Sequence, residues 1–174
     1  MNAKVRVVSN LWLGSNGIQA AVPVEGELTE DALSRRAKVF ALPEPRRLLG
    51  CVFLLDDGEE VVVNVPMLPA LLPDRSGVLG VFPPGWYVSN TGEDVFKRPN
   101  NAAVFNSDGT LRFQIRVGSE SIHHIALVYG MLDGKFSGML GLHAASAEYH
   151  PPEQIYALNP EDPQLISTLH TVRF

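Results

Sequence analysis

A chain of 174 residues can form one domain with a substantial core, and its 45% hydrophobic and 19% charged residues exclude a disordered chain. The formal charge of −5 is shared, since residues 1–97 hold 9 basic and 12 acidic side chains and residues 98–174 hold 5 and 7. Neither half carries the concentrated positive charge that nucleic-acid binding requires, and a mildly acidic protein is better matched to a basic protein partner.

The cellular compartment is indicated by features that the sequence lacks. The first ten residues have no long apolar region behind their basic residues, as a secretory signal would. No segment reaches the roughly 18 apolar residues of a membrane-spanning helix. The single cysteine, Cys51, excludes an internal disulfide and lies in an apolar run, where we expect a buried, unreactive thiol. These observations favour a reducing cytoplasm and exclude a membrane partner.

The first part of the chain predicts strands and one short helix. Strands are expected at residues 4–9 and on both sides of the Asn-Gly turn at 16–17, a hairpin signature. A helix is predicted near residues 29–38, because Thr29 can cap its N-terminus, acidic residues fall in its first turn and basic residues in its last. We expect it to end before the strand-like residues 39–42.

The stretch Leu48–Val65 marks the centre of the predicted core. It consists of two apolar runs joined by Asp57-Gly58, which suits a type I′ hairpin because both central residues of that turn need positive φ. Both arms are almost continuously apolar, so we expect them in the middle of a sheet, covered on both faces. The turn has the highest charge density in the chain, with four acidic residues: Asp56, Asp57, Glu59 and Glu60. It is either a solvated turn that blocks aggregation or an acidic prong for a basic groove.

Residues 65–73 form an apolar segment with prolines at positions 66, 69 and 73. These prolines exclude a mid-sheet strand and a long helix. We expect a loop that covers one face of a sheet, with at most one turn of helix beginning at Pro69. Its apolar side chains are candidates for contact with a partner or ligand: Met67, Leu68 and Leu71.

The rest of the chain predicts further short strands. The polar, Pro-containing residues 98–101 are the candidate boundary between an N-terminal part (1–97) and a C-terminal β meander (98–174), within one compact domain. From residue 111 to 117, Leu, Phe, Ile and Val alternate with Arg112, Gln114 and Arg116, which predicts a half-buried strand. Strands are also expected at residues 122–132, 135–143, 154–158 and 165–174.

This spacing of elements predicts the fold class. Strands at intervals of about 8–12 residues, with 15 glycines and 13 prolines, indicate a mainly β fold of antiparallel hairpins with one or two short helices. The arrangement is expected to be sandwich-like or a propeller-blade-like meander. The chain is too short, and shows no internal repeat, for a closed propeller.

Candidates for catalysis and metal binding are few. His123 and His124 are adjacent in a predicted strand, so their side chains point to opposite faces, and one of them could meet His143 on the paired strand. No Gly-x-Ser-x-Gly elbow or phosphate-binding loop is present, and the cupin-like run from Gly118 lacks the His-x-His and Glu ligands. We therefore expect no metal, no cofactor and no enzyme activity. The alternative is a small-molecule- or metal-binding β-barrel enzyme that uses His123 or His124 with His143.

The segment Asn101–Ile115, a strand, an Asp-Gly turn and a strand, resembles a segment of small bacterial proteins encoded beside secreted toxins. These are the immunity proteins of polymorphic and type VI secretion systems, and the resemblance covers about residues 100–174. It implies tight one-to-one binding of a cognate toxin in the cytoplasm, without catalysis. A second alternative is a structural or assembly subunit bound through its strand edges. The sequence leaves the oligomeric state open.

Overall fold

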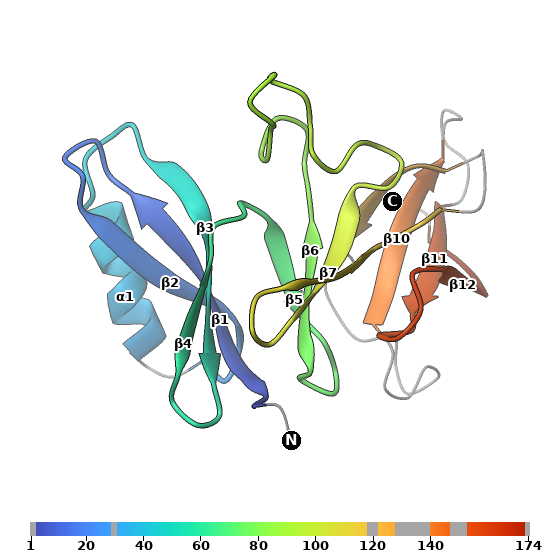
Figure 1. The fold of residues 1–174 in the computed structure, drawn as a ribbon, viewed down its shortest axis with the longest axis horizontal. Helices are drawn as coiled ribbons and strands as arrows, with labels where there is room; N and C mark the ends of the chain where they lie inside the picture. The colour runs from blue at the N-terminus through green and yellow to red at the C-terminus, as the bar shows by residue number, and fades with distance from the viewer. Residues whose placement is uncertain (1–2, 29–30, 118–121, 128–139, 147–152, 173–174) are drawn as a thin grey trace.

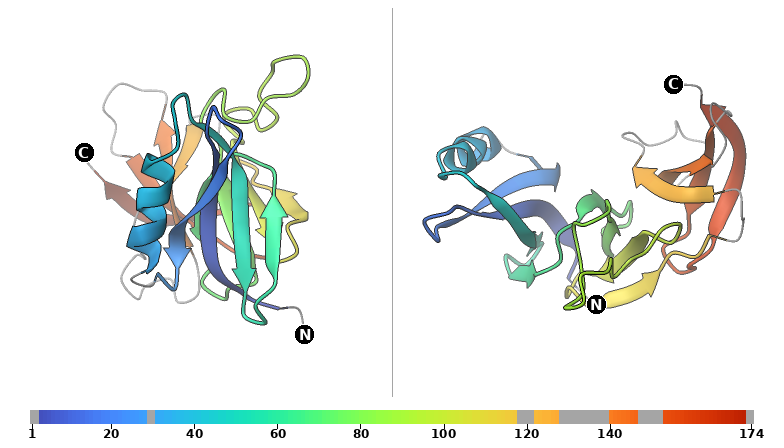
Figure 2. Two further views of the ribbon diagram at one scale, coloured as in Figure 1. Left: turned by 90° about the vertical axis from the view of Figure 1, so that its left-hand side faces the viewer. Right: turned by 90° about the horizontal axis from the view of Figure 1, so that it is seen from above.

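A computed structural model describes residues 3–28, 31–117, 122–127, 140–146 and 153–172. In this part of the chain, twelve strands form three four-stranded antiparallel sheets, accompanied by one short helix (Figure 1). The mainly β fold of antiparallel hairpins that the sequence predicts is confirmed. The sheets follow one another along the chain and lie side by side, in an open, curved row (Figure 2). The helix of the described residues is too short and polar to span a membrane.

Sheet 1 is the N-terminal sheet, with strand order β2-β1-β3-β4. Its strands are β1 (Val5–Leu13), β2 (Gln19–Gly26), β3 (Arg47–Leu55) and β4 (Glu60–Val63). Helix α1 (Asp31–Phe40) lies beside β2 and buries Val39 against Val22. The prediction that the helix ends before a strand-like segment at 39–42 is therefore wrong. Val39 belongs to the apolar side of the helix, which packs on the sheet.

Sheets 2 and 3 are simple meanders, in which each strand pairs with the next. Sheet 2 contains β5 (Leu68–Leu71), β6 (Gly77–Val81), β7 (Ala102–Asn106) and β8 (Leu111–Gln114). Sheet 3 contains β9 (Ile122–Leu127), β10 (Leu140–Ser146), β11 (Glu153–Leu158) and β12 (Leu165–Val172). This regular alternation of strand and turn is what the even spacing of apolar runs predicts.

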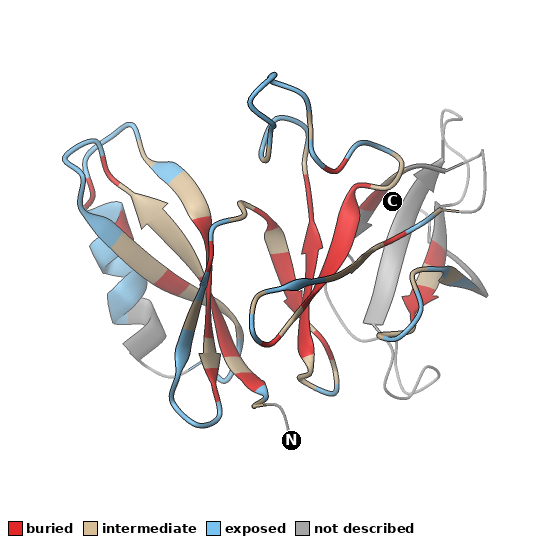
Figure 3. Ribbon diagram, in the orientation of Figure 1, coloured by how far each residue is buried: buried red, intermediate tan, exposed pale blue. Residues whose placement is uncertain are grey.

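Sheet 2 lies between the other two and contributes to a hydrophobic core on each of its faces. One face packs Val78, Ala103 and Phe105 against Val5 and Phe53 of sheet 1. The other face packs Leu79, Val104 and their neighbours against Ile125 and Leu158 of sheet 3. Every residue of β6 is consequently buried, and the central strands form the buried middle of the molecule (Figure 3). A sheet covered on both faces requires continuously apolar strands, as β6 and β7 are.

The arms of the Leu48–Val65 hairpin differ in position. β3 lies inside sheet 1, as predicted, with Cys51 and Phe53 fully buried. β4 is the outermost strand, and the side chain of Val62 is 54% exposed. The prediction that both arms lie mid-sheet is therefore wrong for β4. The prediction that they are covered on both faces is wrong for both arms, because Leu49 and Leu54 of β3 are only half-buried on the face that points away from sheet 2. An apolar run of three valines cannot by itself indicate whether a further strand pairs with it.

The apolar segment 65–73 contains a strand rather than a loop or a helical turn. β5 is the outermost strand of sheet 2, which is where a strand can hold Pro69, since proline has no N–H for a neighbouring strand. The prolines exclude a mid-sheet strand, as predicted, but they permit this edge strand. The segment thus belongs to a sheet, whereas we expected a loop that covers one.

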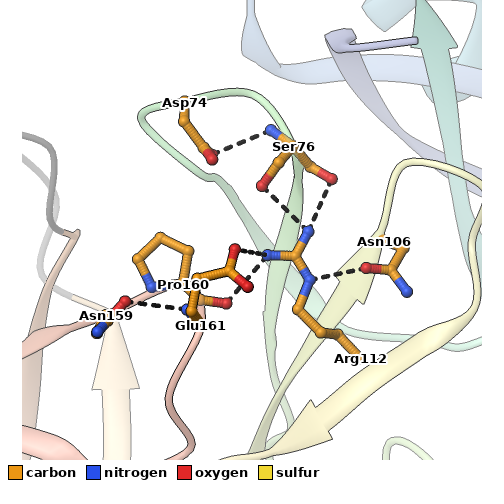
Figure 4. Close-up of polar contacts among 7 residues, drawn as sticks. All are labelled: Asp74, Ser76, Asn106, Arg112, Asn159, Pro160 and Glu161. Atoms are coloured by element: carbon orange, nitrogen blue, oxygen red, sulfur yellow. Dashed lines mark hydrogen bonds and ion pairs between the residues drawn. The ribbon is translucent and has the colours of Figure 1, made fainter. Parts of the chain in front are cut away.

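Arg112 joins sheets 2 and 3 through the turns at one end of the molecule (Figure 4). Its guanidinium donates to the Asn106 side chain (2.7 Å), to the Ser76 carbonyl oxygen and hydroxyl (both 3.0 Å), and to the Pro160 carbonyl oxygen (3.0 Å). It also lies 3.6 Å from the Glu161 carboxylate, and its side chain is only 16% exposed. The alternation over residues 111–117 therefore does not separate solvent-facing from buried side chains, because Arg112 is enclosed while Leu111 is 52% exposed.

The residues proposed as a domain boundary, 98–101, lie between two paired strands. β6 precedes them and β7 follows them, and Val81 of β6 pairs with Ala102 of β7. A division at residue 97 thus runs through sheet 2. Asn101 is 2% exposed and extends the same contact to sheet 3: its amide accepts the Ile125 N–H (2.7 Å) and donates to the Ile125 carbonyl oxygen (3.0 Å). A segment that reads as a polar linker thus contains one buried residue, Asn101, that connects sheets 2 and 3.

Candidate functional site

The acidic turn between β3 and β4 is a three-residue hairpin loop. The Leu55 N–H donates to the Glu59 carbonyl oxygen (2.8 Å), the Gly58 N–H donates to the Leu55 carbonyl oxygen (3.1 Å), and only Gly58 has positive φ (90°). This is a type I turn followed by a left-handed glycine, not the predicted type I′ turn. The same hydrogen-bond pattern closes the loop from Asn106 to Thr110, with Gly109 at φ 81°.

Asp57 and Asp108 stabilise these two loops in the same way. Each carboxylate accepts the N–H of the residue two positions later, Glu59 at 3.0 Å and Thr110 at 2.9 Å. Asn16 does this in the β1–β2 turn, where its side chain accepts the Ile18 N–H (3.1 Å). Asparagine therefore satisfies the same geometry without a charge. The negative charge at positions 57 and 108 is not needed for the turn.

The two loops lie side by side although they are about fifty residues apart in sequence. Gly109 packs so closely on β4 that an added Cβ would lie 2.9 Å from Val63 and 3.0 Å from Val61. Between the loops is an open recess of about 590 Å³. We call this the acidic recess; its lining residues are Ala3, Leu55, Asp57, Glu59, Glu60, Val61, Ser107 and Asp108.

The acidic recess thus collects four carboxylates from two sheets. Asp57, Glu59 and Glu60 come from the hairpin that the sequence singles out, and Asp108 is added by the β7–β8 loop. The Thr110 hydroxyl donates to the Asp108 carboxylate (2.6 Å) and, with the Thr110 N–H, lowers the pKa of Asp108 below its ordinary value. At neutral pH this carboxylate is ionised. The recess can attract a cationic group.

Asp56, the fourth predicted acid of the hairpin, has a different role. Its carboxylate accepts the Lys4 N–H (3.0 Å), and its own N–H donates to the Lys4 carbonyl oxygen (2.9 Å). These bonds attach the hairpin to the residue before β1. Asp56 does not line the acidic recess.

The apolar candidates Met67, Leu68 and Leu71 lie away from the recess. Met67 is fully buried, with its sulfur over Gly80, so a partner cannot reach its side chain without opening the core. Leu68 packs against the core between sheets 2 and 3, and Leu71 packs against the core between sheets 1 and 2. Neither lines the recess. The structure thus places Met67, Leu68 and Leu71 in the hydrophobic cores and not at the acidic recess.

The described residues allow only part of the histidine alternative to be examined. His143 lies opposite Ala126 in the β9–β10 ladder, and His124 lies opposite Ala145, so neither histidine faces the other directly. The side chains of His123 and His143 lie outside what the structure describes, as does all of His150. Among the described residues, no group of three His, Cys, Asp or Glu side chains is arranged to hold a metal ion.

Cys51 is a packing residue, as the sequence predicts. It is fully buried, its thiol donates to the Asn10 side-chain oxygen (3.7 Å), and burial raises its pKa to about 12. A thiol with such a pKa is protonated at neutral pH and is a poor nucleophile.

A second surface feature is the long connection between β6 and β7, which projects from the opposite end of the molecule (Figure 1). It is held by aromatic contacts, with the Phe82 and Phe96 rings stacked at 4.2 Å and the Tyr87 ring 6.1 Å from Phe96. It exposes three large apolar side chains: Trp86, Val88 and Val95. This exposed surface was not predicted from the sequence. The signal was Trp86 directly after Pro-Pro-Gly.

Comparisons of the chain with protein-family models, with curated proteins and with solved structures find no match.

Proposed function

We propose that this chain is a non-catalytic binding protein that uses the acidic recess to hold a basic surface of a partner protein. The observation that carries the proposal is the gathering of Asp57, Glu59, Glu60 and Asp108 around one open recess, from loops of two different sheets. The turn geometry does not need these charges at positions 57 and 108, since Asn16 satisfies an equivalent turn. A binding function for the negative charge accounts for the acidic residues at these two positions.

The partner that we propose is a cognate bacterial toxin, bound one to one and thereby neutralised in the cytoplasm. The resemblance of residues 100–174 to immunity proteins supports this choice. Toxins that act on nucleic acids carry basic active-site surfaces, and a cluster of exposed carboxylates would compete for such a surface. Charges at the rim of an interface that complement those of the partner mainly raise the association rate, and salt screens their effect.

The test begins with the gene neighbourhood, where the proposal expects a gene for a toxin-domain protein, and continues with a titration of this chain against that gene's product. A neutral variant combines Asp57→Asn, Glu59→Gln, Glu60→Gln and Asp108→Asn, which retains the hydrogen-bond acceptors of both turns. We expect its affinity to fall by an order of magnitude or more at low salt, with a weaker salt dependence than the unaltered chain.

Two control variants make the titration specific. Glu44→Gln with Glu93→Gln removes exposed charge away from the recess and should leave the affinity unchanged. Trp86→Ala probes the projecting β6–β7 connection, and a loss of affinity there alone would move the binding surface to that segment. Equal affinity of the neutral variant and the unaltered chain would refute the role of the recess.

A further inference from the structure

One face of sheet 1 is apolar and open. The side chains of β1 and β3 that point away from sheet 2 form, with their neighbours, a groove of about 300 Å³ that is lined only by sheet 1, by Asn64 directly after it and by Arg35 of α1. We call it the open face; its lining residues are Val7, Ser9, Leu11, Gln19, Ala21, Arg35, Leu49, Val52, Leu54, Glu60, Val62 and Asn64. Seven of these twelve residues are aliphatic, and two of the seven, Val7 and Val52, are buried among their neighbours.

The apolar side chains of this face explain why the sequence of the β3–β4 hairpin predicts strands that are covered on both faces. Residues 48–55 are apolar at nearly every position, so the side chains that do not face sheet 2 are apolar too. Leu49 and Leu54 are only half-buried, and Val62 is 54% exposed. A sheet with two apolar faces normally packs on both, and an exposed apolar patch with polar margins is typical of an interface.

The charges at the margins indicate what can cover the open face. β2 and β4 are the two outer strands of sheet 1; Arg35 lies at the β2 margin, and Glu60 lies on β4 at the other. When two copies of a sheet pack face to face about a two-fold axis parallel to the strands, each margin lies over the opposite margin of its partner. The margin that holds Arg35 in each copy then lies over the margin that holds Glu60 in the other. The face is thus self-complementary in charge as well as apolar at its centre, as an isologous interface requires.

We infer that the open face is a homodimer interface, in which sheet 1 of one copy packs on sheet 1 of a second as in an aligned β-sandwich. The inference goes beyond the proposed function, since it concerns a different face of sheet 1. In such a dimer each copy still presents Asp57, Glu59 and Asp108 at its acidic recess, and only Glu60 borders both surfaces. The assembled protein would then hold two partner molecules.

The test is sedimentation equilibrium of the purified chain with no partner present. We expect a monomer–dimer equilibrium in the unaltered chain. Arg35→Glu and Glu60→Arg should each raise the dimer dissociation constant about tenfold or more, because each places two like-charged pairs across the interface. An equimolar mixture of the two variants should dimerise again. In the mixed dimer, the acid introduced at position 35 of one chain faces the base introduced at position 60 of the other, and the native Arg35 faces the native Glu60.

Two further variants test whether this face, and no other, forms the dimer. Val62→Asp puts a charge at an exposed position of the monomer, so it should abolish the dimer while the thermal midpoint of the monomer stays close to that of the parent chain. Lys97→Glu, on the projecting connection, should leave dimerisation unchanged. A strictly monomeric parent chain would overturn the inference, and so would a dimer that tolerates Val62→Asp or a mixture that fails to recover. Dimerisation is measured without a partner. A failure of the dimer inference therefore does not bear on the proposed function, which the titration tests separately.

Discussion

Asn101 pairs with Ile125 as a strand residue would, although its side chain makes the contact. The Asn101 amide accepts the Ile125 N–H at 2.7 Å and donates to the Ile125 carbonyl oxygen at 3.0 Å, and the same amide nitrogen also lies 3.2 Å from the Phe82 carbonyl oxygen. One buried side chain thus satisfies the backbone N–H and carbonyl oxygen of Ile125 in β9 and links sheets 2 and 3. Buried backbone groups need such partners, because leaving one unpaired destabilises the fold.

Replacing Asn101 by Leu should therefore destabilise the protein by about 3 kcal/mol or more, since it leaves an N–H and two carbonyl oxygens without their partner. The measurement is urea denaturation followed by tryptophan fluorescence. Asn16→Asp, which retains the acceptor at an exposed turn, is the control and should change stability little. A loss below about 1 kcal/mol for Asn101→Leu would mean that water or a shifted strand replaces the amide.

Arg112→Lys should destabilise the chain nearly as much as Arg112→Ala, by about 1–3 kcal/mol. The guanidinium reaches Asn106, Ser76 and Pro160 in three directions, and an ammonium group cannot do so. Chemical denaturation compares these variants with Arg116→Ala, whose exposed side chain should contribute little. Full rescue by lysine would show that charge rather than planar geometry matters at this joint.

Two glycines with similar backbone conformations provide a test of the contact beneath the acidic recess. Gly58→Ala meets only the penalty of positive φ, about 1–2 kcal/mol, because no atom lies within 4 Å of its added Cβ. Gly109→Ala should lose more, because its Cβ also meets Val61 and Val63. Thermal unfolding of both variants gives the difference. Equal losses would indicate that the β7–β8 loop can move away from β4 without cost.

Asp108 should make a small contribution to the pH dependence of stability. Its folded-state pKa is lowered by the Thr110 hydroxyl and N–H, so the unfolded chain binds a proton more readily than the folded chain. The stabilisation is therefore present above the ordinary pKa of an aspartate and is lost as the pH falls through the lower folded-state value. Asp108→Asn should show less acid destabilisation than the parent chain when urea midpoints at pH 7 and pH 3 are compared. An identical pH dependence would contradict this assignment.

Cys51 should not react with a thiol reagent while the protein is folded. Its thiol is fully buried and its pKa is raised to about 12, so both access and ionisation are lacking. Ellman's reagent should label it at the rate of unfolding and at once in denaturant. Rapid labelling of the native chain would mean that β3 opens far more readily than its place inside sheet 1 suggests.

Local signals predicted much of the fold. Apolar runs, Asp-Gly and Asn-Gly turns and the capping residue of a helix each act over a few residues. The strands β1, β3 and β7 and the positions of the Asp-Gly and Asn-Gly turns could therefore be predicted from the sequence. Whether a strand lies at the edge or in the middle of a sheet could not be predicted, because this depends on whether a further strand pairs with it. β4 and β5 are both outermost strands for this reason, one exposing Val62 and the other holding Pro69.

The candidate site was predictable only on its hairpin side. Asp57, Glu59 and Glu60 form a dense local charge that is evident from the sequence. Asp108 looks like one more turn residue, and only the packing of Gly109 on β4 brings it to the same recess. Met67 shows the opposite error: an apolar residue in a proline-rich segment looks available for binding, yet its contact with Gly80 closes it into the core.

The central place of sheet 2 also determines how the molecule can come apart. Its two faces belong to different cores, so separating either neighbouring sheet exposes one side of β6 and β7 while the other side stays closed. The amide protons of these two strands should be the last to exchange with deuterated solvent, and those of β4 and β12, at the outer edges, among the first. Sheets 1 and 3 can separate from sheet 2 independently. The separation of one cannot spread to the other unless β6 and β7, which lie between them, also unfold.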